Sequence, residues 1–224
     1  MKFQDYADQE MMMINLAQRL AGDLNAALMS HDRATFCVPG GSTPGPLFDT
    51  LSAIDLDWDR VTVILTDERW VPEESPASNT ALVKSRLLTD KAAAAQFFPL
   101  YTGDSDPEEA LDRLNAGIAP LLPLSVLLLG MGTDLHTASL FPGAVGLKEA
   151  LGDGASPVAA IRVDENAPAR VTLTAPVLKG AMATHVLITG SEKRAALEQA
   201  MKVRDAMVAP VTAVLGDATV HWAE

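Results

Sequence analysis

The sequence contains a single cysteine, Cys37, among its 224 residues. One cysteine excludes an internal disulfide, and together with only four scattered histidines it provides neither a CxxC pair nor an HExxH helix for zinc. The apolar neighbours Phe36 and Val38 predict that Cys37 is a buried strand thiol rather than a nucleophile. We therefore expect a protein that works without a metal ion or a cofactor.

Basic residues are scarce as well, with 17 lysines and arginines against 29 acidic residues and a net charge of -12. Nucleic acids and anionic membrane surfaces are recognised by basic faces, so both are disfavoured as partners. The few cations in loops then become informative, because a phosphorylated metabolite needs only a local group of them. Arg69, Arg170 and Lys193 all lie beside the ends of expected strands.

Long apolar runs are missing too. No stretch approaches the ~20 residues of a membrane-spanning helix. Residues 1–20 mix acidic with apolar side chains, unlike a signal peptide. The sequence therefore predicts a cytoplasmic protein. Its 48% hydrophobic content is enough for one substantial core, which indicates a single domain spanning residues 1–224 that acts as a monomer or homodimer.

Helical and strand patterns alternate along the chain, which predicts an α/β fold with a largely parallel sheet between helices, a three-layer, Rossmann-like arrangement. The expected strands are 34–38, 61–66, 126–129, 158–163, 171–173, 185–189, 211–214 and 218–222. The expected helices are 8–29, 44–53, 79–88, 107–119, 146–151, 175–180 and 191–203.

The segment PGGSTPG at 39–45 follows the first of these strands. Gly40 and Gly41 permit positive φ and a close backbone approach, Ser42 or Thr43 can cap a helix, and Pro44 suits the first helical position. Free backbone N–H groups at a helix start bind anions, so a phosphate site is one interpretation and a tight turn without a ligand is the other. The spacing is not that of a nucleotide-binding P-loop.

A second glycine-rich loop, GMGTDLHTASLFPG at 130–143, places Asp134 two residues before His136 at the end of a buried strand. A turn capped by these two side chains is one interpretation. Ligands of α/β sheets bind at such strand ends, however, so we favour chemistry, with His136 as general base and Asp134 orienting its ring. Gly132 is a candidate substrate-binding residue, and backbone N–H groups of the two glycine loops are candidate oxyanion donors. A GxSxG elbow is absent, which favours direct attack by water.

Charged residues at three further positions are candidates for binding an anionic substrate. Asp67, Glu68 and Arg69 end the strand at 61–66, and the planar fork of Arg69 suits phosphate or carboxylate. Glu68 is equally well explained as a charged loop residue that pairs with its neighbours. Lys193 lies at the start of a helix, where the helix dipole does not stabilise a cation. Binding of a phosphate would explain a lysine at this position better. Arg170 is a further candidate for binding phosphate.

The remaining histidines and the tryptophans have structural explanations. His31, His185 and His221 are isolated, and we interpret them as surface or strand-edge residues. The tryptophans at 58, 70 and 222 are expected to pack rather than to stack on a ligand.

The two glycine loops, TDERWVP at 66–72, the pair Ser78-Asn79 and the GSEK segment at 190–193 together resemble the 6-phosphogluconolactonases of the glucosamine-6-phosphate isomerase/6-phosphogluconolactonase family, a sugar-phosphate isomerase superfamily. The order and spacing match from about residue 34 to the end. The resemblance implies hydrolysis of a small phosphorylated sugar lactone, with His136 as the base and Arg69 and Asn79 in the substrate pocket. Leu135 departs from the pattern, because the family usually has glycine there.

Two other functions are compatible with the same fold. Amino-sugar phosphate deaminases or isomerases share the aspartate near position 67 and the histidine loop, but carry a glutamate where this chain has Phe141. Sugar-phosphate-sensing domains of transcription regulators share the fold without catalysis. Only about 33 residues precede the first expected strand, too few for a helix-turn-helix domain, and the acidic charge disfavours DNA.

Overall fold

A computed structural model describes residues 1–203 and 205–224, and its centre is a seven-stranded sheet in which every neighbouring pair is parallel. The strand order is β1-β10-β9-β6-β2-β3-β5. The strands are β1 (Lys2–Asp5), β2 (Ala34–Val38), β3 (Val61–Leu65), β5 (Gln96–Phe98), β6 (Val126–Gly130), β9 (Ala183–Thr189) and β10 (Thr219–Ala223).

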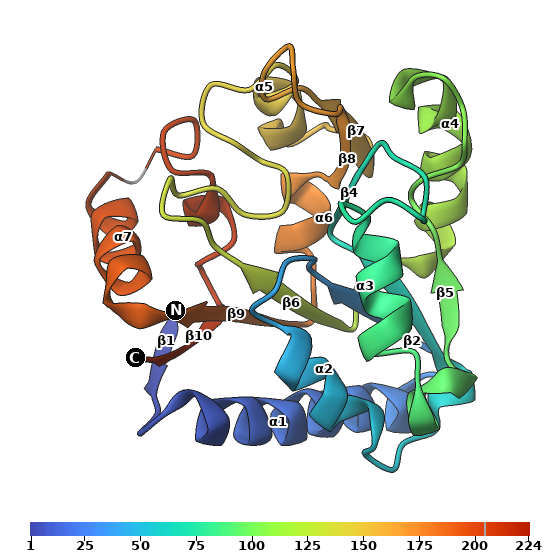
Figure 1. Ribbon diagram of the computed structural model, residues 1–224, viewed down its shortest axis with the longest axis vertical. Coiled ribbons are helices and arrows are strands. Elements are labelled where there is room, and N and C mark those ends of the chain that lie inside the picture. The colour runs from blue at the N-terminus through green and yellow to red at the C-terminus, as the bar shows by residue number, and fades with distance from the viewer. Residues whose placement is uncertain (204) are drawn as a thin grey trace.

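Helices cover both faces of this sheet, which confirms the predicted layered α/β fold. The long helix α1 runs along one side, and α5, α6 and a small second sheet lie on the other (Figure 1). The helices are α1 (Gln9–Ser30), α2 (Gly45–Ser52), α3 (Asn79–Arg86), α4 (Pro107–Ile118), α5 (Leu147–Leu151), α6 (Ala175–Lys179) and α7 (Gly190–Val203). Short 3-10 turns occupy Trp58–Arg60, Asp90–Ala94, Ala119–Leu121 and Pro210–Ala213. No helix of the described ranges is long and apolar enough to cross a membrane.

Helix α1 shows how the sequence pattern produces this packing. The Asp8 side chain accepts a hydrogen bond from the backbone N–H of Met11 at 2.7 Å and so caps the first turn. The predicted apolar stripe, Met12, Leu16, Leu20, Leu24 and Leu28, is buried against the sheet and its neighbouring helix α2.

Cys37 lies in β2 with no solvent exposure, as predicted. Burial, reinforced by the nearby Asp67 carboxylate, raises the pKa of its thiol well above the ordinary value. Because the thiolate is the nucleophilic form, this cysteine is chemically inert.

The second sheet departs from the predicted arrangement. It is antiparallel, with the order β4-β8-β7, and consists of β4 (Asp67–Arg69), β7 (Val158–Ile161) and β8 (Arg170–Leu173). The predicted strands at 158–163 and 171–173 therefore exist but do not join the parallel sheet. The strand predicted at 211–214 is wrong, because Pro210 begins a 3-10 turn there.

The pairing of the central strands determines where the loops meet. Strands β2 and β6 are neighbours, and the chain proceeds from β2 toward β3 on one side and from β6 toward β9 on the other. Such a reversal of strand order opens a crevice at the carboxyl ends. The loops after β2, β3 and β6 and the start of α7 after β9 all lie at this edge.

His185 and His221 are buried, with 2% and 3% exposure, so the prediction of surface or strand-edge positions is wrong for them. They form a continuous chain of contacts that runs from Tyr6, the residue after β1, through β10 and β9 to α1. The Tyr6 hydroxyl lies 2.8 Å from His221 Nδ1, His221 Nε2 lies 3.0 Å from His185 Nδ1, and His185 Nε2 lies 2.9 Å from Asp23 Oδ2. Each ring nitrogen thus has a partner, which is what burial of an imidazole requires.

Because His221 is buried in this row of contacts, we expect the protein to lose stability in mild acid. Burial, the neighbouring His185 and Arg19 lower the pKa of His221 from 6.5 to about 3. Below pH 6.5 the unfolded chain takes up a proton that folded His221 refuses, so stability falls as the pH drops from 6.5 toward 3, by ~2 kcal/mol at pH 5. Denaturant unfolding at pH 7 and pH 5 measures this loss.

The matched variants are His221→Gln and His31→Gln, because His31 is exposed. His221→Gln should have a flatter pH dependence than the parent, whereas His31→Gln should retain the parental slope. Equal slopes in all three proteins would contradict a role for His221.

Candidate active site

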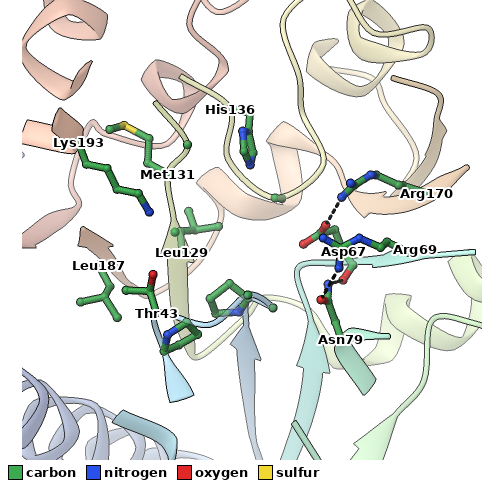
Figure 2. A pocket seen from close by; sticks show the side chains of 17 residues that line it. Thr43, Asp67, Arg69, Asn79, Leu129, Met131, His136, Arg170, Leu187 and Lys193 are labelled. Carbon is green, nitrogen blue, oxygen red and sulfur yellow. Dashed lines mark hydrogen bonds and ion pairs between the residues drawn. The ribbon is translucent and has the colours of Figure 1, made fainter. Parts of the chain in front are cut away.

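The pocket at the carboxyl edge has a volume of about 750 Å³, including its open mouth. Apart from Ser42 and Asp134, every residue predicted for the site lines it (Figure 2). These residues are Gly40, Gly41, Thr43, Asp67, Arg69, Asn79, Gly132, His136, Arg170 and Lys193. The size is within the range of small-molecule sites.

The first glycine loop differs in part from its prediction. Gly41 has a φ of 86°, as expected of a left-handed position. Ser42 is exposed, its carbonyl accepts from Gly45 at 3.2 Å, and neither Ser42 nor Thr43 caps α2, whose N-cap is Pro44. The capping prediction is therefore wrong. No described residue accepts from the backbone N–H groups at 40–43, so they are available to a ligand.

Gly40 has a specific steric role in the pocket. A Cβ at this position would lie 1.9 Å from the side-chain oxygen of Asn79. Asn79 in turn donates to the Asp67 carbonyl at 3.0 Å and accepts from Arg69 at 3.2 Å. The missing side chain of Gly40 therefore makes room for Asn79 beside Arg69.

His136 and Asp134 form the predicted pair, with Nδ1 of the ring 2.5 Å from a carboxylate oxygen. Nδ1 therefore faces Asp134, and no described residue hydrogen-bonds Nε2. The Asp134 side chain is 54% exposed, unlike the buried carboxylate of a hydrolase triad. Gly132 N–H donates to the His136 carbonyl at 3.0 Å, which removes it from the candidate oxyanion donors.

Gly132 also leaves space for this pair. A Cβ on it would lie 2.3 Å from both the Asp134 carboxylate and the His136 ring. Gly132→Ala should therefore displace the imidazole and lower turnover by roughly tenfold to a hundredfold, since ångström-scale misplacement has costs of this size. Initial rates on the phosphorylated sugar lactone that the family resemblance implies measure the effect. The control is Gly154→Ala, where an added Cβ meets nothing within 4 Å; equal rates in both variants would contradict the steric argument.

Leu135, the departure from the family pattern, has a φ of 72°. This left-handed conformation costs a leucine roughly 1–2 kcal/mol. Its side chain is only 6% exposed and belongs to the hydrophobic core, and burying a leucine contributes about 1.5–3 kcal/mol. Its carbonyl also accepts from Val211 at 3.1 Å. Packing therefore offsets the strain of the left-handed backbone at Leu135.

Two arginines form a cross-strand pair in the small sheet, where Arg69 of β4 is directly opposite Arg170 of the adjacent strand β8. Like charges in this position repel. Burial, together with the charge of Arg69, lowers the pKa of Arg170 against the opposing effect of Asp67 and Glu68. The Arg170 Nε is buried and has no hydrogen-bond partner among the described residues. The pair is thus arranged for a negatively charged ligand.

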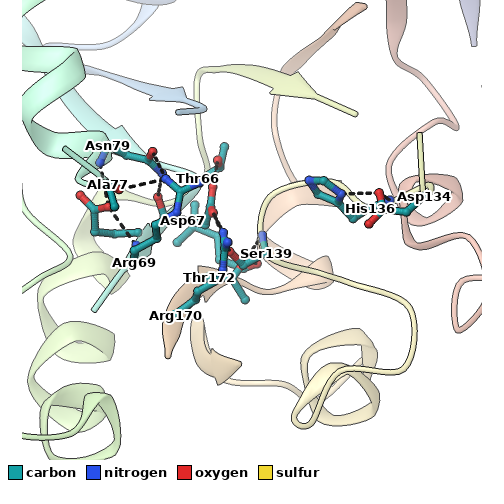
Figure 3. A network of polar contacts seen from close by, with 12 residues as sticks. Thr66, Asp67, Arg69, Ala77, Asn79, Asp134, His136, Ser139, Arg170 and Thr172 are labelled. Carbon is teal, nitrogen blue, oxygen red and sulfur yellow. Dashed lines mark hydrogen bonds and ion pairs between the residues drawn. The ribbon is translucent and has the colours of Figure 1, made fainter. Parts of the chain in front are cut away.

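Asp67 balances part of this charge from a buried position (Figure 3). Its carboxylate accepts hydrogen bonds from Ser139 at 2.6 Å and Thr66 at 2.9 Å, and lies 3.8 Å from Arg170. The network joins the loop after β3 to the histidine loop and to β8. Asp67 therefore holds three parts of the pocket in register.

Glu68 is fully buried and is not a charged loop residue that pairs with its neighbours' side chains, which corrects that interpretation. Its carboxylate accepts from the backbone N–H groups of Asn79 and Thr80 at 2.8 and 2.7 Å, at the start of α3. It also accepts from Arg69 N at 2.9 Å, from the Thr80 hydroxyl at 2.8 Å and from Ser78 at 3.3 Å. A negative charge at a helix N-terminus is favourable, and here it fixes the backbone of Arg69 and Asn79.

Lys193 enters the pocket from the first turn of α7, facing the loop that contains Thr43 (Figure 2). Burial lowers the pKa of its ammonium group. No described carboxylate lies within ion-pair distance of it. The two sides of the pocket thus carry Lys193 and the arginine pair, with His136 above.

Sequence reasoning did not identify the role of Ser139 or Phe141. Ser139 bonds Asp67, and the Phe141 ring stacks on His136 with centroids 4.1 Å apart. Both belong to the TASLFPG part of the second glycine loop, so their proximity to the histidine was the available signal. Within the described part of the chain, no three histidine, cysteine or acidic residues gather as a metal site.

Comparison with known proteins gives a consistent assignment. The family model described as glucosamine-6-phosphate isomerases/6-phosphogluconolactonase matches residues 7–222. A 6-phosphogluconolactonase of Pseudomonas aeruginosa is 41% identical over 213 residues, covering 92% of this chain and 88% of that protein. One from Rhizobium meliloti is 42% identical over 219 residues, covering 93% and 94%.

Solved structures agree with these relatives. A 6-phosphogluconolactonase from Shewanella baltica superposes with a TM-score of 0.96 and 31% identity, covering 100% of this chain and 97% of that one. A monomeric glucosamine-6-phosphate deaminase superposes with a TM-score of 0.83 at 18% identity, a likeness of fold.

Proposed function

The chain belongs to the glucosamine-6-phosphate isomerase/6-phosphogluconolactonase family, and we propose that its pocket hydrolyses 6-phospho-D-glucono-1,5-lactone to 6-phospho-D-gluconate in the oxidative pentose phosphate pathway. The observation that carries the proposal is the His136 imidazole, oriented by Asp134, above a pocket with cations on two sides. A phosphorylated sugar lactone would use both features, because its phosphate binds the cations and its ring carbonyl is attacked by the water that His136 activates.

The reaction begins with a water molecule between His136 Nε2 and the ring carbonyl carbon. Nε2 takes a proton from the water as its oxygen bonds to the carbonyl carbon, and negative charge develops on the carbonyl oxygen. Asp134 stabilises the resulting imidazolium through Nδ1. When the tetrahedral species collapses, the bond to the ring oxygen breaks and the imidazolium returns the proton to that oxygen. The products are the free hydroxyl and the carboxylic acid, which ionises.

Phosphate binding falls to the groups with unsatisfied positive charge or N–H donors. Lys193, Arg69 and the backbone of Gly40, Gly41 and Thr43 line the pocket, with Ser42 in the same loop and Arg170 as a further ligand. Gly40, Gly41, Ser42 and Thr43 contribute through this backbone. Asp67 and Asn79 are suited to the sugar hydroxyls. Cytoplasmic location and a monomeric or homodimeric state stay predictions of the sequence.

The direct test uses freshly generated 6-phosphoglucono-δ-lactone, with the rate compared with spontaneous hydrolysis. Acceleration that is proportional to enzyme concentration is expected. Turnover of glucosamine 6-phosphate with release of ammonia would instead indicate the deaminase function. Tight binding of sugar phosphates without turnover of either compound would indicate a sensing domain.

Loss of either pocket cation should weaken substrate binding more than catalysis. Charged hydrogen bonds contribute roughly 1.5–3 kcal/mol, so Lys193→Ala and Arg69→Ala should each raise KM by about tenfold to a hundredfold. Lys202→Ala, an exposed lysine of the same helix, is the control for Lys193→Ala. If both pocket variants retain the parental preference for phosphorylated over unphosphorylated sugar acids, the phosphate site has been misplaced.

A further inference from the structure

The loop between His136 and Phe141 turns back on itself. Leu140 N–H donates to the Thr137 carbonyl at 2.9 Å, and Ala138 within this turn has a φ of 48°. The Thr137 hydroxyl donates to the Gly130 carbonyl at 2.8 Å, which ties the turn to the end of β6. The turn therefore returns the chain so that Phe141 lies against the His136 ring.

The contact between the two rings is a close stack. Their centroids are 4.1 Å apart and their planes meet at 24°. Among the described residues, the His136 side chain has one polar contact, from Nδ1 to Asp134. The Asp134 side chain is itself 54% exposed. This hydrogen bond constrains the ring at Nδ1, and the stack constrains the ring plane from its face.

Phe141 is itself held from the side of the small sheet. The Arg170 guanidinium carbon lies 4.9 Å from the Phe141 ring centroid. Arg170 Nη1 lies 3.8 Å from the Asp67 carboxylate and donates to Ser139 at 3.4 Å, and these partners are buried. A line of contacts thus runs from Asp67 through Arg170 and Phe141 to His136.

We propose that Phe141 is a positioning residue, whose ring, held by Arg170, stacks on the His136 imidazole and fixes the plane in which Nε2 faces the pocket. The proposal rests on the proposed function, in which His136 is the base. An aromatic face also stabilises an adjacent cation, so the same stack favours the imidazolium that forms when water is deprotonated. Phe141 stacks on the base itself and reaches the proposed phosphate ligands only through Arg170, so its main effect is on kcat.

The test compares Phe141→Leu and Phe141→Tyr in steady-state lactonase assays. Phe141→Leu should lower kcat by about tenfold, the scale of an aromatic pair, while KM and 6-phosphogluconate binding stay within about twofold. Phe141→Tyr, which keeps the ring, should restore kcat to within about twofold of the parent. Phe3→Leu is the control. The Arg194 guanidinium carbon lies 5.2 Å from the Phe3 ring centroid, a similar contact, but Phe3 is on the edge strand β1, away from the pocket.

A parental kcat in Phe141→Leu, a rise in KM without a fall in kcat, or a tyrosine variant no better than leucine would each overturn the proposal. A parent enzyme without lactonase activity would overturn the proposed function instead, so the two failures are distinguishable. NMR of the parent protein supplies a test that needs no substitution of Phe141. A His136 ring proton, assigned by its loss in His136→Gln, should carry an upfield ring-current shift, and its absence would contradict the stack.

Discussion

His136→Ala should lower lactonase turnover on the order of 100-fold or more, because it removes both the base that deprotonates water and the acid that protonates the leaving oxygen. Binding of 6-phosphogluconate should be largely intact, since the proposed phosphate ligands Lys193 and Arg69 lie on other elements, α7 and β4. Single-turnover rates and product titration by calorimetry measure the two quantities separately.

His31→Ala is the matched control for this experiment, because His31 is an exposed histidine at the end of α1. It should keep the parental rate. Near-parental turnover in His136→Ala would exclude His136 as the base, and a parallel loss of product binding would indicate that the loop had been rearranged rather than the base removed.

Glu68→Gln should cause a large loss of stability together with weaker substrate binding. The fully buried carboxylate accepts from three backbone N–H groups and two hydroxyls, and an amide turns one accepting oxygen into a donor that faces them. Leaving buried donors without an acceptor costs roughly 2–4 kcal/mol. For a chain of this length that corresponds to a fall in Tm of about 4–15 °C.

The same substitution loosens the backbone of Arg69 and Asn79, so KM should rise while kcat changes less. Glu73→Gln is the matched control, because Glu73 is an exposed glutamate that pairs with Lys84 and lies outside the buried network. A Glu68→Gln protein with the melting temperature and KM of the parent would show that the carboxylate is not needed at the start of α3.

Local patterns in the sequence determined the elements and the loops that carry the chemistry. Strand β2 and the apolar stripe of α1 follow from periodicity, and the alternation of strands with helices requires parallel pairing. The carboxyl ends of parallel strands lie at the same edge of a sheet. The motifs at 39–45, 66–72 and 130–143 each follow such a strand, so they had to lie together at that edge.

Short elements whose partners are distant in the sequence could not be predicted from local patterns. β1 has no buried position, and its partner β10 is at the other end of the chain, so nothing local marks it as a strand. The residues 211–214 are apolar enough for a strand, but Pro210 and the hydrogen bond from Val211 to Leu135 favour a turn. Pairing energy between distant segments decides such elements.

Only the tertiary structure decided the environment of the individual polar groups. Glu68 and Asp134 are both carboxylates beside a glycine loop or a strand end, yet one is fully buried under five donors and the other is half exposed beside His136. Likewise, the isolated histidines His185 and His221 become a buried chain because β9 and β10 are neighbours. Burial and hydrogen bonding depend on which segments meet in space, and this is set by the packing of the whole chain rather than by the residues on either side.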